Sequence, residues 1–172
     1  REYERTLVTV MNAYVGPSMR SYLTSFEDKL KAIQISPHVN IVRSDGGLMS
    51  VQRASDSPVH TMLSGPAGGV SGAAFLAKLA GYENALGFDM GGTSTDVSLI
   101  QDGKPLISRQ TSLGYYPIKI PSVEVHSVGA GGGSIAHVPM TGALRVGPKS
   151  AGAAPGPACY GKGGEYPTVT DA

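Results

Sequence analysis

The sequence predicts an α/β protein in which helices flank a mixed sheet that contains an antiparallel β-meander. Three observations lead to this fold class. Apolar residues recur with a helical period over residues 3–35, a run of small residues follows a helix-start signal at residues 64–80, and strand-like segments alternate with turns over residues 85–146. With 172 residues, 41% of them hydrophobic, the chain is long enough for one domain with a core, or for part of a larger one.

The first helix is predicted over residues 3–35. Gly16-Pro17 interrupts its apolar pattern, so proline either kinks one helix or separates two. Ser36-Pro37 is expected to end the segment. Short strands are then expected at residues 39–43 and 48–51, on either side of a turn at residues 44–47.

The second helix is predicted over residues 64–80, with Ser64 as its N-cap and Gly81 as its stop. Asp102-Gly103 is a hairpin signal. The expected strands are at residues 85–90, 95–100, 106–111, 122–128, 135–138 and 143–146. Residues 147–164 are rich in Gly, Pro and Ala and are expected to form a loop.

Charge and composition narrow the class of protein. A net charge of +1 gives no reason to expect a nucleic acid or an anionic membrane as partner. No apolar run approaches the roughly 20 residues that cross a bilayer, and no signal peptide is recognisable. Cys159 is the single cysteine, which rules out an internal disulfide and favours a cytoplasmic protein. The chain begins without Met, and both ends are expected to continue in a longer protein.

The main chemical signal lies between two predicted strands, where Asp89 closes the first and Asp96 opens the second. Gly91 and Gly92 between them predict a tight turn whose backbone N–H groups converge on an anion. Asp89 is the candidate for binding Mg²⁺ through water, and Asp96 for the same role or for orienting a water. The hydroxyls that can add donors are those of Thr93 and Thr95. The motif is neither a P-loop nor a Rossmann fingerprint.

Weaker candidates leave alternatives open. The glycine run at residues 129–133, with Gly131 and Gly132 at its centre, either approaches a phosphate, a substrate or a partner subunit, or forms a bulge between strands. The residues from Ser64 to Pro66 have two interpretations. They form a helix N-terminus that faces an anion, or they only cap the helix and pack closely against its neighbours. His126 has a metal or general-base interpretation and a structural one. Cys159 has a nucleophile interpretation, but no base is identifiable for it, and a non-catalytic place in the loop is favoured.

These motifs resemble those of the hydantoinase A/5-oxoprolinase family, and the segment from Asp89 to Asp96 resembles the second phosphate loop of actin-like ATPases. Family-like segments also occur in order at residues 64–70, 125–134, 144–148 and 154–161. Asp45 departs from the family, which usually has Asn there. The resemblance implies an actin-like, ribonuclease-H-like ATPase lobe with ATP bound between two lobes. Residues 1–172 would be a fragment of the catalytic domain, with a helix-rich part (1–81), a strand-rich phosphate-loop part (82–146) and a Gly/Pro-rich loop (147–172).

The resemblance also implies a reaction. It is ATP- and Mg²⁺-dependent opening of a cyclic amide, such as a hydantoin or 5-oxoproline, with help from a hydantoinase B-type partner subunit or domain. Gly91, Gly92 and Thr93 would contact phosphate, and Asp89 would hold the metal or a water. Two alternatives remain: an ATP-dependent subunit of an acetone or acetophenone carboxylase, and an actin-like nucleotide-responsive interaction module.

Overall fold

The computed structural model describes residues 2–35 and 38–172, so the helix stop expected at Ser36 and Pro37 lies outside the described residues. The chain divides into two compact units. The first contains Arg1–Ala85 and Ile100–Glu124, and the second contains Leu86–Leu99 and Val125–Ala172. Within the described ranges, no helix has the length and hydropathy needed to cross a membrane.

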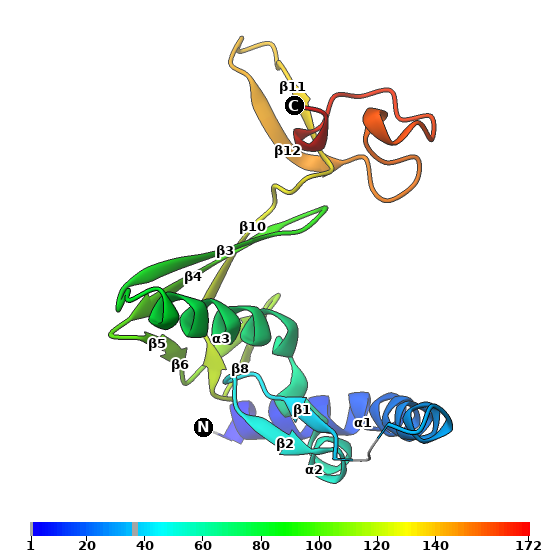
Figure 1. Ribbon diagram of the computed structural model, residues 1–172, viewed down its shortest axis with the longest axis vertical. Coiled ribbons are helices and arrows are strands. Elements are labelled where there is room, and N and C mark those ends of the chain that lie inside the picture. Colours follow the sequence, from blue (N-terminus) through cyan, green and yellow to red (C-terminus); the bar gives the residue numbers. More distant parts are fainter. Residues whose placement is uncertain (1, 36–37) are drawn as a thin grey trace. The chain divides into compact units, whose positions relative to one another are not determined.

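The described residues of the first unit form three α-helices and short strands (Figure 1). Its elements are α1 (Glu2–Ala32), β1 (Asn40–Val42), β2 (Leu48–Ser50), α2 (Val51–Asp56), the 3₁₀-helix η1 (Pro58–Thr61), α3 (Ser64–Leu79), β5 (Lys104–Pro105), β6 (Ile107–Ser108), β7 (Thr111–Leu113), β8 (Tyr116–Ile118) and β9 (Ser122–Val123).

Helix α1 continues through Pro17, so the proline does not divide it. Packing on both sides of the proline explains this, because the buried contacts outweigh one missing backbone hydrogen bond. After it, Leu23 (1% exposed) packs with Met49 and Ala54. Before it, apolar residues of α1 pack against a second cluster of buried residues, Val59, Ile118 and Ile120.

The strands β1 and β2 form the predicted antiparallel pair around the turn at residues 44–47. Helix α2 follows β2 directly and was not expected. Ser50 caps it, since its hydroxyl oxygen accepts a hydrogen bond from the N–H of Arg53 at 3.2 Å.

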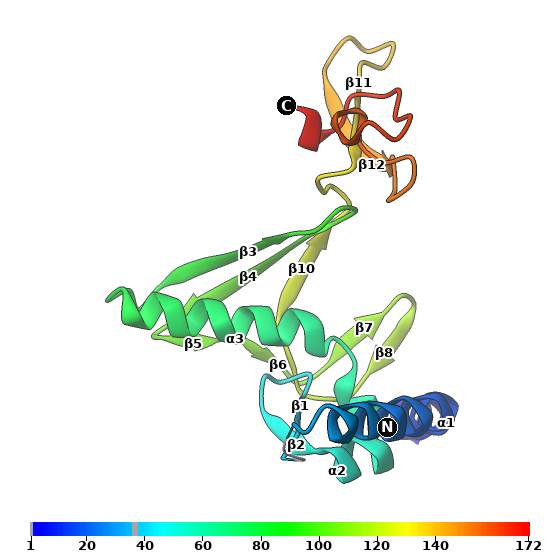
Figure 2. The same cartoon turned by 45° about the vertical axis from the view of Figure 1, so that its right-hand side comes forward.

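Helix α3 has the predicted extent, but the predicted N-cap is wrong. Leu63, in the left-handed region at φ 60°, occupies the cap position, and Ser64 is already helical. No side chain caps this helix start. The end agrees with the sequence, because Gly81 adopts φ 80° and terminates the helix. Figure 2 shows α3 as a long helix, and it packs against β1, β5 and β9.

The turn at Asp102-Gly103 is confirmed, with φ values of 51° and 71° that suit a tight hairpin. The strand expected over residues 106–111 is not one strand returning along β4. The pairing with β4 stops at Pro105, opposite Ile100, because proline has no N–H to extend the ladder. Thereafter β6 pairs with β9, and β7 pairs with β8 in a separate hairpin.

The second unit contains most of the sheet that holds the candidate site. Its elements are β3 (Ala85–Met90), β4 (Thr95–Gln101), β10 (Val125–Val128), β11 (Ser134–His137), β12 (Arg145–Ser150) and the 3₁₀-helices η2 (Ala158–Tyr160) and η3 (Val169–Asp171). The first residue of β3 and the last two of β4 belong to the other unit. The strand order is β10-β4-β3, with β10 antiparallel to β4, and β11 pairs antiparallel with β12.

Candidate functional site

The predicted hairpin joins β3 to β4, with Asp89 near the end of β3 and Asp96 near the start of β4. The turn is closed by a hydrogen bond from the Gly91 N–H to the Ser94 carbonyl at 2.9 Å. Asp89, Gly91, Gly92 and Thr93 are exposed. A backbone loop between two strands is thus open to solvent on one side, as an anion-binding turn requires.

The glycine run at residues 129–133 packs against the inner side of this turn. The antiparallel pairing of β10 with β4 sets Val128 opposite Thr95, so the chain leaves β10 beside the turn. The N–H groups of Gly132 and Gly133 donate to the carbonyls of Gly91 and Gly92, at 2.8 and 2.7 Å. A Cβ atom on Gly131 would lie 2.6 Å from the Gly91 carbonyl oxygen. Glycine is needed here because two backbone segments touch.

The amides of Gly131 and Gly132 are therefore committed to the protein. The Gly131 N–H donates to the Ser134 hydroxyl at 2.8 Å, and the Gly132 N–H donates to the Gly91 carbonyl. The sequence left open whether this run approaches a phosphate, a substrate or a partner subunit, or forms a bulge between strands. In the structure both glycines lie against the Gly91–Gly92 turn.

The two threonines of the motif have different environments. The Thr95 side chain is 3% exposed, and its hydroxyl donates to the Ala130 carbonyl at 2.5 Å. Thr93 is exposed at the tip of the turn. Asp96 accepts a hydrogen bond from the Ser127 hydroxyl of β10 at 2.5 Å. Thr95 and Asp96 therefore fix β4 to β10 and the glycine loop, whereas Thr93 is exposed.

A cavity of about 390 Å³ opens beside Gly92 and Thr93. Lys162 is the one charged side chain among its lining residues. A Cβ atom added to Gly92 would meet nothing within 4 Å, so the protein itself does not require glycine there. The remaining lining residues come from the glycine run and the C-terminal segment: Gly133, Gly152, Ala153, Pro157, Tyr160 and Thr170.

Asp171 anchors the C-terminal side of this cavity. Its carboxylate accepts hydrogen bonds from the N–H groups of Cys159 and Thr168, both at 2.8 Å, and from the Thr168 hydroxyl at 2.8 Å. Hydrogen bonds from the Cys159 backbone and side chain, and then from Thr168, lower the pKa of Asp171 well below its usual value.

The surroundings of Cys159 disfavour a thiolate. Its hydrogen bond to Asp171 raises the pKa of the thiol, and burial and the carboxylate charge raise it further. A reactive cysteine needs the opposite shift, because the thiolate is the attacking species. The cysteine belongs instead to the anchored loop.

The donor set suits a hydrated magnesium ion with a nucleotide phosphate. Mg²⁺ keeps several waters and takes one or two carboxylates in such sites, and Asp89 supplies an exposed carboxylate at the end of β3. Throughout the described residues, no three His, Cys, Asp or Glu side chains group together, and His126 thus has no metal-ligand cluster around it. In the same part of the chain, no hydrogen bond engages the N–H of Gly92 or Thr93.

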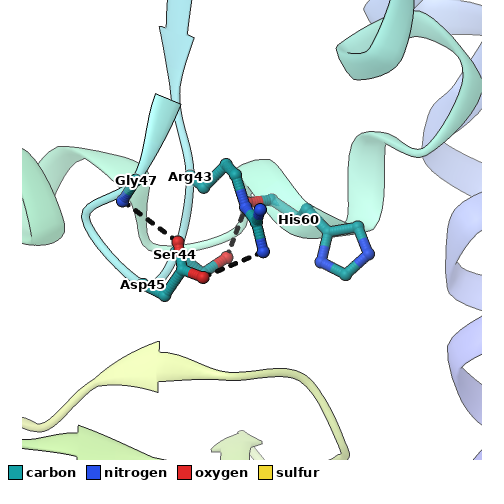
Figure 3. Close-up of polar contacts among 5 residues, drawn as sticks. All are labelled: Arg43, Ser44, Asp45, Gly47 and His60. Atoms are coloured by element: carbon teal, nitrogen blue, oxygen red, sulfur yellow. Dashed lines mark hydrogen bonds and ion pairs between the residues drawn. The ribbon is translucent and has the colours of Figure 1, made fainter. Parts of the chain in front are cut away.

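The other Gly-Gly turn, at residues 44–47, is structural (Figure 3). Asp45 forms an ion pair with Arg43 at 2.9 Å and accepts a hydrogen bond from the Gly47 N–H at 3.1 Å. The N–H and the hydroxyl of Ser44 both donate to the His60 carbonyl at 2.8 Å. Gly46 has φ 79°, and a Cβ atom there would lie 2.6 Å from the Ser71 hydroxyl. These contacts shape the turn and connect it to η1.

Sequence similarity to known proteins identifies the family of this chain. Residues 5–172 match the family model described as Hydantoinase/oxoprolinase. The chain is 42% identical to the caprolactamase subunit alpha of Pseudomonas jessenii, over 100% of this chain and 25% of that protein. It is 43% identical to 5-oxoprolinase 1 of Arabidopsis thaliana, over 100% of this chain and 13% of that protein.

Solved structures agree with the predicted fold. The crystal structure of the ATP-dependent caprolactamase from Pseudomonas jessenii superposes with a TM-score of 0.82 at 41% identity, over 99% of this chain and 25% of that one. A nucleotide-free structure of acetone carboxylase superposes with a TM-score of 0.78 at 33% identity, over 99% and 24%. The mixed α/β fold with antiparallel sheets is therefore confirmed as part of a larger protein fold. The chain spans a quarter or less of these relatives, and it belongs to the hydantoinase/oxoprolinase family.

Proposed function

We propose that this chain supplies the phosphate-binding turn of an enzyme that opens a cyclic amide at the expense of ATP. The observation that supports it most directly is the exposed turn at Gly92 and Thr93, which borders a cavity with a single cationic side chain. Relatives named 5-oxoprolinase and caprolactamase give the reaction class.

The chemistry follows from the weak electrophilicity of an amide. ATP transfers its γ-phosphoryl group to the oxygen of the imidic tautomer, whose hydroxyl proton is lost, and ADP leaves. Water then adds to the activated carbon, and the ring C–N bond breaks as the nitrogen is protonated. Hydrolysis of the resulting acyl phosphate releases inorganic phosphate and the ring-opened acid. In this proposal the amides of Gly92 and Thr93 bind the phosphate oxygens, whereas the Gly91 N–H closes the turn through its hydrogen bond to the Ser94 carbonyl. Asp89 holds Mg²⁺ through water. Asp96, fixed by Ser127, has the secondary role of orienting a water or the metal shell.

Gly131, Gly132 and Thr95 act indirectly in this proposal. They hold the turn in its open shape by hydrogen bonds and close backbone contact. Water attack takes place in a hydantoinase B-type partner subunit or domain, an assignment supported by the caprolactamase relative being named a subunit. We place the enzyme in the cytoplasm, where ATP is available.

A second candidate function is ATP-dependent ketone carboxylation. The similarity to acetone carboxylase at 33% identity favours it. The same turn would then bind the phosphate that is transferred to an enol oxygen. The described residues of the turn serve both reactions equally, so substrate trials are needed to distinguish them.

The test uses the full-length protein with its partner subunit. Phosphate release from ATP is measured with a panel of hydantoin, 5-oxoproline, caprolactam, and acetone with bicarbonate. We expect one cyclic amide to stimulate phosphate release and to appear as its ring-opened acid. Stimulation by acetone and bicarbonate alone would support the carboxylase. ATP turnover that no substrate changes would reject both and favour an interaction module.

The Asp89→Asn variant connects the activity with the turn. It removes the proposed metal carboxylate with little change in volume, so substrate-stimulated phosphate release should fall by at least about 100-fold. A variant with unchanged activity at saturating Mg²⁺ would contradict the role assigned to Asp89.

A further inference from the structure

Lys162 lines the same cavity as Gly92 and Thr93, which belong to the turn at residues 91–94, here called the phosphate turn. We infer that Lys162 is the cationic ligand of the phosphate held by this turn, so that the C-terminal loop completes the anion site. The inference rests on the proposed function and adds to it a residue from a segment about 70 positions later in the chain.

The charge of the cavity supports this assignment. Its nine lining residues include no carboxylate and one cation, which is Lys162. A phosphate that leaves water needs compensating positive charge, and lysine binds phosphate as a mobile point charge. The Thr170 hydroxyl is already committed to the Gly132 carbonyl at 2.8 Å. Lys162 is therefore the group in this cavity with both the charge and the reach to bind an anion.

Lys162 is not committed to another partner. No ion pair or ring contact involves it anywhere in the described part of the chain. Other lysines differ: Lys119 pairs with Glu4 at 3.0 Å, and the Lys149 ammonium lies 5.5 Å from the centre of the Tyr166 ring. An ammonium group with no protein acceptor can accept an incoming anion without first breaking a contact.

The backbone presents Lys162 from a fixed loop. Gly161 and Gly163, on either side of it, adopt φ 66° and 88°, which glycine tolerates and other residues rarely do. The preceding 3₁₀-helix η2 is held by the Asp171 carboxylate, which accepts hydrogen bonds from the N–H groups of Ala158 (3.3 Å) and Cys159 (2.8 Å). The lysine is thus placed at the cavity by an anchored segment.

The same segment is bonded to the phosphate turn. The Thr170 N–H donates to the Gly132 carbonyl at 2.9 Å, and the Gly132 N–H donates to the Gly91 carbonyl at 2.8 Å. A chain of hydrogen bonds therefore connects η3, the glycine run and the turn, all within one compact unit. This connection sets the position of the Lys162 loop with respect to Gly92.

The test measures ATP binding to the full-length protein with its partner subunit by calorimetry in the presence of Mg²⁺. Lys162→Met keeps the aliphatic stem and removes the charge, whereas Lys162→Arg keeps the charge. Lys149→Met is the matched control, because Lys149 does not line the cavity. A charge-assisted contact predicts a Kd increase of roughly 10- to 100-fold for Lys162→Met. We expect a change below about 3-fold for Lys162→Arg and Lys149→Met.

Gly92→Ala tests the proposed function of the turn separately from the inference about Lys162, because it changes the turn and leaves the lysine in place. If Gly92→Ala weakens ATP binding and Lys162→Met does not, the turn binds phosphate and the assignment of Lys162 is wrong. If neither variant changes the Kd, the proposed function fails with it. Equal losses in Lys162→Met and Lys149→Met would also overturn the inference, since the effect would then come from net charge rather than from the cavity.

Discussion

Two glycines in neighbouring segments are required for different reasons. At Gly131 a Cβ atom would lie 2.6 Å from the Gly91 carbonyl oxygen, inside the contact distance of two backbone segments. At Gly92 the space is open, and φ does not fall in the left-handed region. The fold therefore explains glycine at 131, whereas no contact among the described residues requires glycine at 92.

This contrast predicts opposite outcomes for two alanine substitutions. Gly131→Ala forces the glycine run away from the turn and should destabilise the protein by about 1–3 kcal/mol, as overpacking does. Gly92→Ala should leave stability within about 0.5 kcal/mol of the wild type and weaken ATP binding. Thermal unfolding and ATP calorimetry of the full-length variants measure both quantities. A Gly131→Ala variant as stable as wild type would show that the contact is not tight.

At the scale of elements, local signals predict the Asp102-Gly103 turn and the two longer helices, α1 and α3. Asp102-Gly103 formed the expected hairpin, and Gly81 ended α3. The main hairpin of the site was also predictable, because its glycines and flanking apolar strands are contiguous in the sequence. Helix α2 was missed, although Ser50 before a short polar run and Pro58 after it were available as start and stop signals.

Elements that depend on distant partners were not predictable. The ladder beyond Pro105 belongs to β6 and β9, which are 14 or more residues apart, and no local pattern specifies this pairing. The commitment of the Gly131 and Gly132 amides was missed for the same reason, since their acceptors lie in other segments. The sequence alone favours a solvated Lys162 over a phosphate-binding one, because the position of Lys162 beside Gly92 exists only in the folded unit.

The packing of η1 against the β1–β2 turn predicts a pH response. Burial lowers the pKa of His60 below 6.5, and the charges of Arg43 and Arg53 lower it further, while Asp45 acts in the opposite direction. Above pH 6.5 the folded and unfolded states both hold neutral histidine. As the pH falls below 6.5, the unfolded state binds the proton more readily, so stability decreases until the pH passes the folded pKa.

The measurement is hydrogen exchange on peptides covering residues 40–62 of the full-length protein, between about pH 7.5 and pH 5.5 and corrected for intrinsic exchange rates. The wild type should lose protection toward the acidic end. His60→Gln removes the titrating ring but keeps the backbone carbonyl that Ser44 uses, and it should flatten the response. The same acid-dependent loss in both proteins would assign it to another group.

At the scale of the whole molecule, the chain comprises two compact units, and the phosphate turn, the glycine run and the Lys162 loop all belong to one of them. In that unit, hydrogen bonds of Asp171, Thr170 and the glycine run at residues 129–133 connect the C-terminal segment to the turn. The two clusters of buried hydrophobic residues lie in the other unit. Among the described residues, backbone hydrogen bonds therefore hold the proposed phosphate site in shape.

The partial site predicts weak nucleotide binding by residues 1–172 alone. Association costs at least about 4 kcal/mol in lost translational and rotational freedom. One turn and one lysine offer few contacts to offset it, in a chain that spans a quarter or less of its relatives. We expect a Kd of roughly 1 mM or weaker for ATP and negligible turnover. The Kd for ATP is measured by calorimetry on the isolated segment, after circular dichroism has established its secondary structure. The full-length protein in the same buffer is the positive control, and micromolar binding by the segment would mean that these residues form a complete nucleotide site.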